Sequence, residues 1–407
     1  MRILIYGLNY APEVTGIGKY TGEMAAWLSS RGHEVRIVCA PPYYPQWRIA
    51  EGYNWARYKV EVVDGIRVYR CPVWIPPRPS GVRRILHLGS FAISSSIVML
   101  AQVGWRPDII LIIEPPIFCA PIAILTARLS GARAWLHIQD FELDAAFELG
   151  LIRVGWLRSI ACYIERWLMR RFDLVSTISN RMFERLGVKG VPFSRRVLFA
   201  NWVDANQIYP MIQPSSFRDE LGIGLQGVVA LYSGNMGQKQ GLEIVIEAAR
   251  SLSSESNVCF VMCGQGAAYS RLRAMAEGLA NIIWIPLQPM ERLNELLNLA
   301  DIHLLPQSAN AADLVMPSKL TGILASGRPV VATAVEGTEV WSVVEGKGIN
   351  TPPGNLDAFV DAILSLARDP EKRIALGKSG RKYAEEHLSR DKVLERFEAE
   401  LLKLVRA

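Results

Sequence analysis

The sequence predicts an α/β protein with two doubly wound domains, and three observations lead to this fold class. Short runs rich in Ile, Val and Leu alternate with helical patterns along the 407-residue chain, which is typical of parallel sheets covered by helices on both faces. Half of the residues are apolar, enough for two domains of roughly 200 residues each. A break rich in Pro and Ser, between residues 201 and 225, separates two such series.

The first series begins with the apolar run at residues 2–7, which predicts a strand. The amphipathic stretch 20–30 predicts the helix that follows it. The later apolar runs are short and bounded by turn residues, so we predict buried strands there as well. These strands lie at residues 34–40, 66–70, 108–113, 134–138, 174–178 and 197–200.

The second series repeats this alternation and ends in charged helices. Its predicted strands lie at residues 228–233, 258–263, 282–285, 302–306 and 329–333. The charged helices are predicted at residues 357–368, 371–386 and 391–405. We therefore predict a first domain at 1–205, a linker at 206–225, a second domain at 226–385 and a terminal helix at 386–407. That last helix either caps the second domain or crosses back onto the first.

The charge balance favours an anionic partner. The formal net charge is +6 and the sequence pI is about 9.0, which suits phosphates or acidic lipid head groups. Nucleic acid is not expected, because no basic run interleaved with aromatic residues is present. The cysteines are scattered among apolar neighbours without metal-site spacing, so we expect reduced thiols and no bound metal. The chain opens on a strand pattern rather than an export signal, so we expect a cytoplasmic protein.

The uncharged stretch 85–105 follows Arg83 and Arg84 and approaches the length of a membrane span. It also carries His87 and several serines, and such polar residues are unfavourable within a membrane span. Three alternatives stay open: a buried core helix, an interfacial helix beside an anionic membrane surface, and a true span.

The turn after the first strand is rich in glycine and leads into the first helix. Gly16 and Gly18 let backbone amides approach an anion, and the helix N-terminus adds partial positive charge. We expect a phosphate or a sugar there, with a plain surface loop as the alternative. The glycines follow the strand by about eight residues, so the turn does not match the tight dinucleotide-binding fingerprint.

A second glycine-rich turn follows the predicted strand 228–233. Ser233, Gly234 and Lys239 lie in it, and a lysine over such a turn can neutralise the charge that develops on a departing diphosphate. Gly264, which follows the next strand, belongs to the same predicted binding set. The alternative for Lys239, a solvated lysine at a helix start, is weak because a cation opposes the helix dipole there.

A third segment with phosphate-binding character begins at Pro317. This proline at a helix start leaves Ser318 and the following amides free to face a ligand, and Lys319 supplies another charge. The alternative is a helix cap with a surface lysine.

His137 and Asp140 lie at the end of the predicted strand 134–138, where open α/β sheets expose functional side chains. We name both as candidate catalytic residues. For the histidine, a structural hydrogen-bond donor is an equally weighted alternative.

Several of these segments, taken in order, resemble family 4 of the retaining glycosyltransferases. They are the N-terminal Gly-rich loop, residues 32–35, residues 234–241 and residues 325–330. Longer stretches resemble family members of colanic acid biosynthesis that are regarded as fucosyltransferases. These stretches lie at residues 9–23, 40–47 and 86–91.

The resemblance implies a GT-B fold, in which two Rossmann-like domains face each other across a cleft. It implies an acceptor on the first domain, a nucleotide-sugar donor on the second, and hexosyl transfer with retention and without a metal. By position, Gly16 would contact the donor phosphate, Lys239 would neutralise it, and His137 would lie near the transferred sugar.

The resemblance also implies a role in exopolysaccharide biosynthesis. We expect a sugar, with fucose from GDP-fucose as the candidate, to move to a polyprenyl-diphosphate-linked acceptor. The expected place is the inner face of the cytoplasmic membrane, with Arg83, Arg84 and residues 85–103 as the peripheral membrane patch. No cofactor beyond the nucleotide sugar is expected.

The chain departs from the family pattern before the lysine. The family usually carries an arginine a few residues upstream, where this sequence has Asn235 and Met236. We therefore expect Lys319 to share the task of Lys239.

A second departure concerns the two family glutamates, one of which binds ribose. Leu314 and Gly322 occupy their places, so ribose recognition must differ, with Asp313 or backbone groups around Ser318 as the expected substitutes. The departures keep two alternatives open: a nucleotide-sugar epimerase of the same fold, and a non-catalytic scaffold that binds sugar nucleotides.

Overall fold

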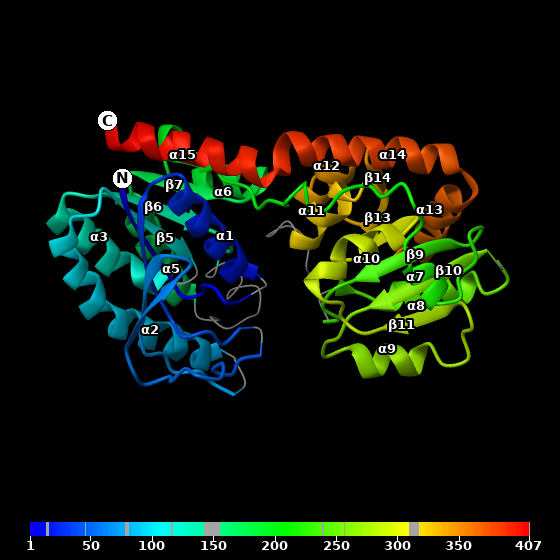
Figure 1. Cartoon of the computed structure of the whole chain (residues 1–407), viewed down its shortest axis with the longest axis horizontal. Helices are drawn as coiled ribbons and strands as arrows, with labels where there is room; N and C mark the ends of the chain where they lie inside the picture. Colours follow the sequence, from blue (N-terminus) through cyan, green and yellow to red (C-terminus); the bar gives the residue numbers. More distant parts are fainter. Residues whose placement is uncertain are drawn as a thin grey trace. The chain divides into compact units, whose positions relative to one another are not determined.

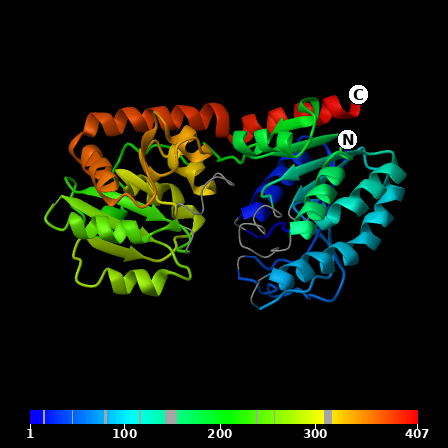
Figure 2. The ribbon, with the colours of Figure 1, turned by 180° about the vertical axis from the view of Figure 1, so that it is seen from behind.

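The computed structural model divides the chain into two compact units (Figure 1). Unit 1 comprises residues 1–200 and 394–407, and unit 2 comprises residues 201–393. Both chain ends lie in unit 1 (Figure 2). The structure describes residues 1–13, 16–44, 46–77, 81–114, 117–141, 155–237, 240–255, 257–308 and 317–406.

Unit 1 is built on a sheet with the strand order β3-β4-β2-β1-β5-β6-β7-β8. Neighbouring strands are parallel, except that β3 runs antiparallel to β4. The order reverses beside β1, as it does in a doubly wound sheet. The strands are β1 Arg2–Gly7, β2 Glu34–Cys39, β3 Lys59–Val63, β4 Ile66–Arg70, β5 Ile109–Glu114, β6 Arg133–Ile138, β7 Leu174–Thr177 and β8 Arg196–Leu198.

Helices cover the sheet of unit 1 because alternate strand residues need apolar partners. Leu4 and Tyr6 of β1 share a buried cluster with Phe91 and Met99 from one helix and Ala123 from another. The helices are α1 Gly16–Ser30, α2 Gly81–Ala101, α3 Ala120–Ser130, α5 Gly155–Met169 and α6 Asn180–Val188, with short 3-10 turns at Gln102–Trp105, Ile117–Cys119 and Phe193–Arg195.

The last helix, α15 (Arg390–Arg406), packs on unit 1 from Leu394 onward. Phe397 stacks on Phe199, with ring centroids 4.1 Å apart. His33 Nε2 donates to the Glu398 carboxylate at 2.8 Å. Of the two arrangements that the sequence left open, the structure shows the terminal helix against the N-terminal unit.

Unit 2 contains a parallel sheet in the order β11-β10-β9-β12-β13-β14. Its strands are β9 Val228–Ser233, β10 Val258–Cys263, β11 Ile282–Ile285, β12 Ile302–Leu305, β13 Val330–Thr333 and β14 Gly348–Thr351. Its helices are α7 Phe217–Glu220, α8 Glu243–Ser251, α9 Tyr269–Met275, α10 Leu293–Leu299, α11 Ser318–Ala325, α12 Glu339–Val344, α13 Leu356–Arg368 and α14 Pro370–Tyr383, with a 3-10 turn at Met290–Arg292 and a π turn at Ala384–Leu388. In Figure 1, α14 runs along one border of this unit and α9 along the opposite one.

The predicted strands are confirmed, with ends that differ by at most two residues. The strands β3 and β14, which are both edge strands, were not predicted from the sequence. Val60 and Val62 of β3 are largely exposed, and β14 is short and polar, so neither carries the apolar run of a buried strand.

The segment Gly81–Trp105 is long and apolar enough to cross a membrane by length and composition, with a mean hydropathy of 1.5 over its best window. In the structure it is α2 and the turn that follows. His87, Phe91 and Ser95 are fully or almost fully buried against the sheet. Thus α2 is a packed helix that keeps one exposed face.

Candidate functional site

The carboxyl edge of the unit 2 sheet brings two glycine-bearing loops together. The strand order reverses between β9 and β12, and open α/β sheets bind ligands beside such a reversal. The Gly234 amide, just after β9, donates to the Cys263 carbonyl at the end of β10 at 2.9 Å. The Met236 amide donates to the Gln265 carbonyl at 2.8 Å. The loops after β9 and β10 therefore run side by side.

Glycine is required where these loops touch. Gly264 has a φ of 153°, and a Cβ there would overlap the carbonyl oxygen of Gly234. Gly266 has a φ of 155°, and a Cβ there would lie 2.5 Å from the Met236 carbonyl oxygen. Because neither position accepts a side chain, bare backbone faces this edge, as close binding of a phosphate requires.

Lys319, the second residue of α11, supplies a cation over the first of these loops. Its Nζ donates to the Tyr232 hydroxyl at 3.0 Å and lies 4.3 Å from the centre of that ring. A Cβ on Gly234 would lie 3.1 Å from Nζ. Desolvation lowers the pKa of Lys319 to about 8. Within the described part of the chain, the contacts of Lys319 are with the Tyr232 hydroxyl and ring, not with a carboxylate.

Tyr232 is a site residue that the sequence analysis missed. Its hydroxyl donates to the Asn235 carbonyl at 2.5 Å while it accepts from Lys319. It thereby holds both the glycine loop and the cation in place. The sequence shows only an aromatic residue near a strand end, and the contact to a lysine 87 positions away depends on the fold.

Three further residues of the predicted donor set lie near this edge or on the same helix, whereas Gly16 and Gly18 lie in unit 1. Ser233 ends β9 and is half-buried. Pro317 has extended backbone just before α11, and Ser318 begins the helix and is exposed. The first amides of a helix have no intrahelical acceptor, so they can face an anion.

Lys239 lies outside the described residues, and so do Asp313 and Leu314. The predicted role of Lys239 therefore stays a prediction. Among the described residues, Lys319 is the lysine that contacts the glycine loop after β9.

In unit 1, Glu13 ties together the loops that follow β1 and β2. Its carboxylate accepts from the backbone amides of Tyr43 and Tyr44, each at 3.0 Å, and from Asn9 Nδ2 at 2.9 Å. Burial raises the pKa of Glu13, although these hydrogen bonds oppose the shift. Glu13 was not predicted from the sequence, because its amide partners come from a distant loop.

The two predicted glycines of this turn differ in their surroundings. Gly16 begins α1, is exposed and has a φ of 61°, so its amide is accessible to a ligand. Gly18 is buried, and a Cβ there would lie 2.6 Å from Glu13 Oε2. Gly18 therefore serves the packing of the buried carboxylate in this structure, which the sequence did not reveal.

His137 lies within β6 and is 2% exposed. Its Nδ1 is 2.9 Å from Ser176 Oγ, and its Nε2 is 2.9 Å from Gln139 Nε2. Desolvation lowers the pKa of His137 to about 3. Both ring nitrogens have partners, and this arrangement favours the structural alternative over a proton-transfer role. Asp140 follows the strand and is half-buried.

The exposed face of α2 is apolar. Val82, Ile93 and Ile97 are each at least 70% exposed, and they fall on one side of the helix because residues four and eleven apart share a face. Arg83 and Arg84 lie at its start and are exposed.

Helix α5 presents a second exposed apolar face, which the sequence analysis did not identify. Its exposed residues on that face follow the spacing i, i+4, i+7, i+8 and i+11. They are Trp156, Ile160, Tyr163, Ile164 and Trp167. That spacing is visible in the sequence, but it does not tell whether the apolar side faces the core or the surface.

No group of three or more His, Cys, Asp or Glu among the described residues is placed to hold a metal ion. The six cysteines are free thiols, and four of them are buried.

Two family models match the chain over most of its length. Residues 15–202 match the model described as "Glycosyl transferase 4-like domain", and residues 215–383 match the model described as "Glycosyl transferases group 1".

Two curated relatives align with almost the whole chain. "Putative colanic acid biosynthesis glycosyl transferase WcaI" of Escherichia coli (strain K12) is 44% identical over 98% of both proteins. "GDP-mannose-dependent alpha-(1-6)-phosphatidylinositol monomannoside mannosyltransferase" of Mycolicibacterium smegmatis is 25% identical over 94% of this chain and 93% of that protein.

Solved structures share the fold at low sequence identity. Sucrose-phosphate synthase from Thermosynechococcus elongatus superposes with a TM-score of 0.76 at 15% identity, over 99% of this chain and 98% of the other. Anabaena HepE, solved in complex with UDP and glucose, gives a TM-score of 0.70 at 14% identity over 99% and 100% of the two chains. The predicted fold class, two Rossmann-like α/β units of the GT-B type, is confirmed.

Proposed function

The chain belongs to the glycosyltransferases that join a 4-like domain to a group 1 domain, and from this premise we propose that it transfers a hexose from a nucleoside diphosphate sugar to a lipid-linked oligosaccharide. The proposed reaction retains the anomeric configuration and uses no metal. The proposed process is exopolysaccharide biosynthesis of the colanic acid type, in keeping with the relative that is 44% identical.

The observation that carries this proposal is the half-buried Lys319 ammonium above the glycine loop after β9. A desolvated cation beside bare backbone and a helix start is suited to a diphosphate. Both loops are held by backbone hydrogen bonds, so they need little reorganisation when charge appears.

The proposed chemistry follows from the charge that develops during transfer. The bond between the anomeric carbon and the diphosphate oxygen breaks, and a bond from that carbon to an acceptor hydroxyl oxygen forms on the same face. The hydroxyl proton passes to the leaving phosphate. Lys319, together with Lys239, stabilises the negative charge that grows on the leaving diphosphate. This charge is larger in the transition state than in the bound donor, so the two lysines lower the barrier to transfer.

GDP-fucose is the donor that we propose first. A relative named for its dependence on GDP-mannose aligns with most of the chain, while a structural neighbour was solved with UDP and glucose. A screen of nucleotide sugars would therefore identify which base and which sugar the donor carries.

We propose that the acceptor is reached at an anionic membrane surface on the cytoplasmic side. The exposed face of α2 offers Ile93 and Ile97 for the apolar boundary and Arg83 and Arg84 for phosphate head groups. This placement suits a peripheral protein whose acceptor carries a polyprenyl diphosphate.

Isothermal titration calorimetry with GDP, UDP, GDP-fucose and GDP-mannose tests the donor site. We expect saturable binding of one nucleotide class by the wild-type chain and at least tenfold weaker binding by Lys319→Met, because a charged contact contributes about 1.5–3 kcal/mol. Undiminished binding by the variant would remove the role proposed for Lys319.

Incubation with donor alone separates the epimerase alternative. An isomerised nucleotide sugar, formed without acceptor, would support the epimerase. Sugar transfer onto a lipid-linked acceptor would dispose of both the epimerase and the non-catalytic scaffold.

A further inference from the structure

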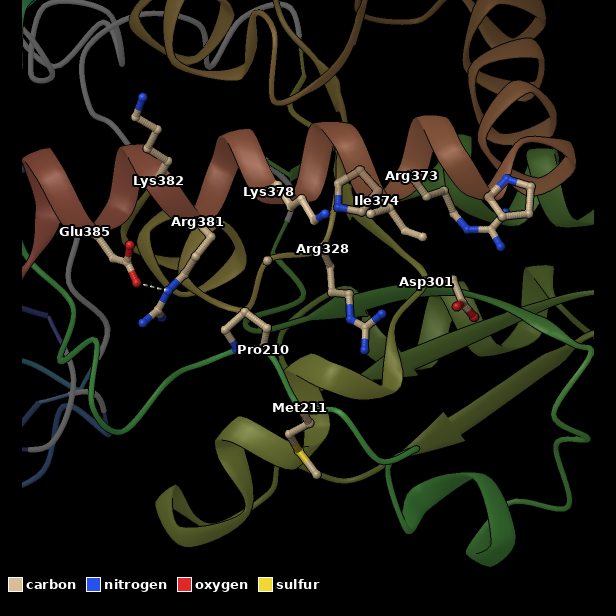
Figure 3. A pocket seen from close by; sticks show the side chains of 13 residues that line it. Pro210, Met211, Asp301, Arg328, Arg373, Ile374, Lys378, Arg381, Lys382 and Glu385 are labelled. Atoms are coloured by element: carbon tan, nitrogen blue, oxygen red, sulfur yellow. Dashed lines mark hydrogen bonds and ion pairs between the residues drawn. The ribbon is translucent and has the colours of Figure 1, made fainter.

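A strongly basic pocket lies in unit 2, and none of the residues of the site described above lines it. Its volume is about 460 Å³, and its walls are α14, the turn between α11 and β13, and the segment at Pro210 and Met211 (Figure 3). Two carboxylates line it, from Asp301 and Glu385. The cationic side chains that line it are Arg328, Arg373, Lys378, Arg381 and Lys382.

The walls of this pocket are held by close backbone contacts. Gly327 has a φ of 69°, and a Cβ there would lie 2.7 Å from Pro210 Cγ. A Cβ on Gly377 of α14 would overlap the Gly327 carbonyl oxygen. Arg381 donates from one terminal nitrogen to the Ile208 carbonyl at 2.6 Å and to the Ala325 carbonyl at 2.9 Å. The pocket is therefore a fixed feature of the fold rather than a gap between loose side chains.

Both carboxylates already have cationic partners. Asp301 accepts from Arg218, which does not line the pocket, at 2.6 Å. Glu385 pairs with Arg381 at 2.6 Å, as the dashed line in Figure 3 marks. One terminal nitrogen of Arg373 donates to two backbone carbonyls at the end of α13. These contacts leave positive charge in the pocket uncompensated.

Arg328 lies between Arg373 and Arg381 in Figure 3. Its Nε is buried and has no hydrogen-bond partner within the described residues. Neither Lys378 nor Lys382 forms an ion pair with another described residue. Burial, together with the nearby Arg218 and Arg373, lowers the pKa of Arg328, although the Asp301 carboxylate opposes this shift. A guanidinium nevertheless stays charged at neutral pH.

Such an arrangement costs free energy unless an anion occupies it. A buried, unpaired donor is costly, and like charges held in a half-buried pocket repel one another. Phosphate accepts several charge-assisted hydrogen bonds and suits the planar fork of arginine. The pocket is also within the size range of small-molecule sites, so it has room for more than a bare ion.

We propose that this pocket binds the phosphate group of a phosphorylated small molecule or lipid head group, with Arg328 and Lys378 as its principal contacts. The site is distinct from the donor site, because none of the residues assigned to donor binding lines it. It does not depend on the glycosyltransferase reaction proposed above.

Calorimetric titration with inorganic pyrophosphate tests this site, using the full chain with Lys319→Met to weaken the donor site. We expect saturable binding, reduced at least tenfold by Arg328→Gln and by Lys378→Gln. The matched control is Lys372→Gln, because Lys372 lies on the same helix and outside the pocket; we expect its affinity to stay within about twofold of the parent.

Lys378 is exposed, so Lys378→Gln keeps the test valid if Arg328→Gln does not fold. Vesicles of phosphatidylglycerol form a second arm. If they bind with the same dependence on Lys378 and pyrophosphate does not, the phosphate comes from a lipid head group. Failure of pyrophosphate and vesicles to bind, or binding that Lys378→Gln and Lys372→Gln affect equally, would overturn the proposal.

Discussion

At the scale of single residues, Lys319 combines a stability cost with a binding advantage. Its ammonium is desolvated, and its hydrogen bond goes to the neutral Tyr232 hydroxyl rather than to a carboxylate. Binding sites for charged ligands often contain charged side chains that destabilise the protein when the ligand is absent. The sequence predicted Lys319 as a phosphate contact, but it predicted Lys239 as the main residue that neutralises the diphosphate.

We predict that nucleotide binding weakens as the pH rises through about 8. The folded pKa of Lys319 is about 8, below its ordinary value of 10.5, so the free protein loses this charge above that pH. Calorimetry from pH 6.5 to 9.5 should show a falling affinity in the wild-type chain and a flatter profile in Lys319→Met. A wild-type profile that matches the variant would contradict the assignment.

The same shift has a consequence for stability. The unfolded chain binds more protons than the folded chain between about pH 8 and 10.5, so this residue makes the fold more stable as pH rises through that window. Lys319→Met should therefore be at least as stable as the wild-type chain at pH 7, measured by urea denaturation.

Gly264 shows how a single missing side chain shapes the site. We predict that Gly264→Ala lowers the free energy of unfolding by about 3 kcal/mol and weakens nucleotide binding, because the new Cβ would overlap the Gly234 carbonyl. Gly224→Ala is the control, because a Cβ there meets nothing within 4 Å; it should stay within about 0.5 kcal/mol of the parent. Equal stability of the two variants in urea denaturation would show that the loops can move apart.

At the scale of elements, the apolar strands were predictable, and the edge strands β3 and β14, which lack an apolar run, were not. The runs at β1, β9 and β10 are apolar and buried apart from the end residues Arg2 and Ser233 and the half-buried Cys259, because helices cover both faces of the sheet. In β3, by contrast, Lys59 and Glu61 are charged, and Val60 and Val62 are largely exposed, a pattern that a surface loop also allows. Pairing with β4, not local composition, makes it a strand.

Helix α2 was predicted as an apolar stretch with three possible environments. Its sequence carries apolar residues on all sides, so periodicity alone could not separate a core face from a membrane face. In the structure Phe91 and Met99 are buried while Ile93 and Ile97 face outward. Only the packing of α2 against the sheet shows that the first pair is buried and the second pair is exposed.

We predict that Ile93→Asp combined with Ile97→Asp reduces binding to vesicles that contain phosphatidylglycerol by at least tenfold, since both side chains leave the proposed lipid contact. Nucleotide affinity should stay unchanged, because neither Ile93 nor Ile97 belongs to the predicted donor set. The control is Val188→Asp, at another exposed apolar position of unit 1. A vesicle sedimentation assay in which the control loses as much binding as the double variant would argue against α2 as the contact.

At the scale of the whole molecule, the sequence predicted the two α/β units because their alternation of strand and helix repeats on either side of one break. The sequence pointed to Gly234, Gly264 and Lys319 because they follow strands or begin a helix, where α/β proteins bind ligands; the structure brings these residues to one edge of the sheet, and their role in donor binding stays a prediction. The sequence did not predict Tyr232 or Glu13, because their partners come from distant loops. Long-range contacts of this kind appear only once the chain is folded.

The site geometry and the family assignment together give the central claim: a sugar leaves a nucleoside diphosphate whose charge is met by lysine and backbone amides. The claim concerns unit 2, while acceptor and membrane contacts are assigned to unit 1. A measurement of transfer therefore tests both assignments in one reaction.

The most direct test is sugar transfer from GDP-fucose, and from UDP-linked and other GDP-linked sugars, onto a polyprenyl-diphosphate oligosaccharide, followed by mass spectrometry and by NMR of the new anomeric centre. We expect one donor to add a single sugar with its anomeric configuration retained, in the presence of a chelator, and Lys319→Met to slow the transfer at least tenfold. Transfer with inversion, or transfer at an unchanged rate in Lys319→Met, would contradict the account.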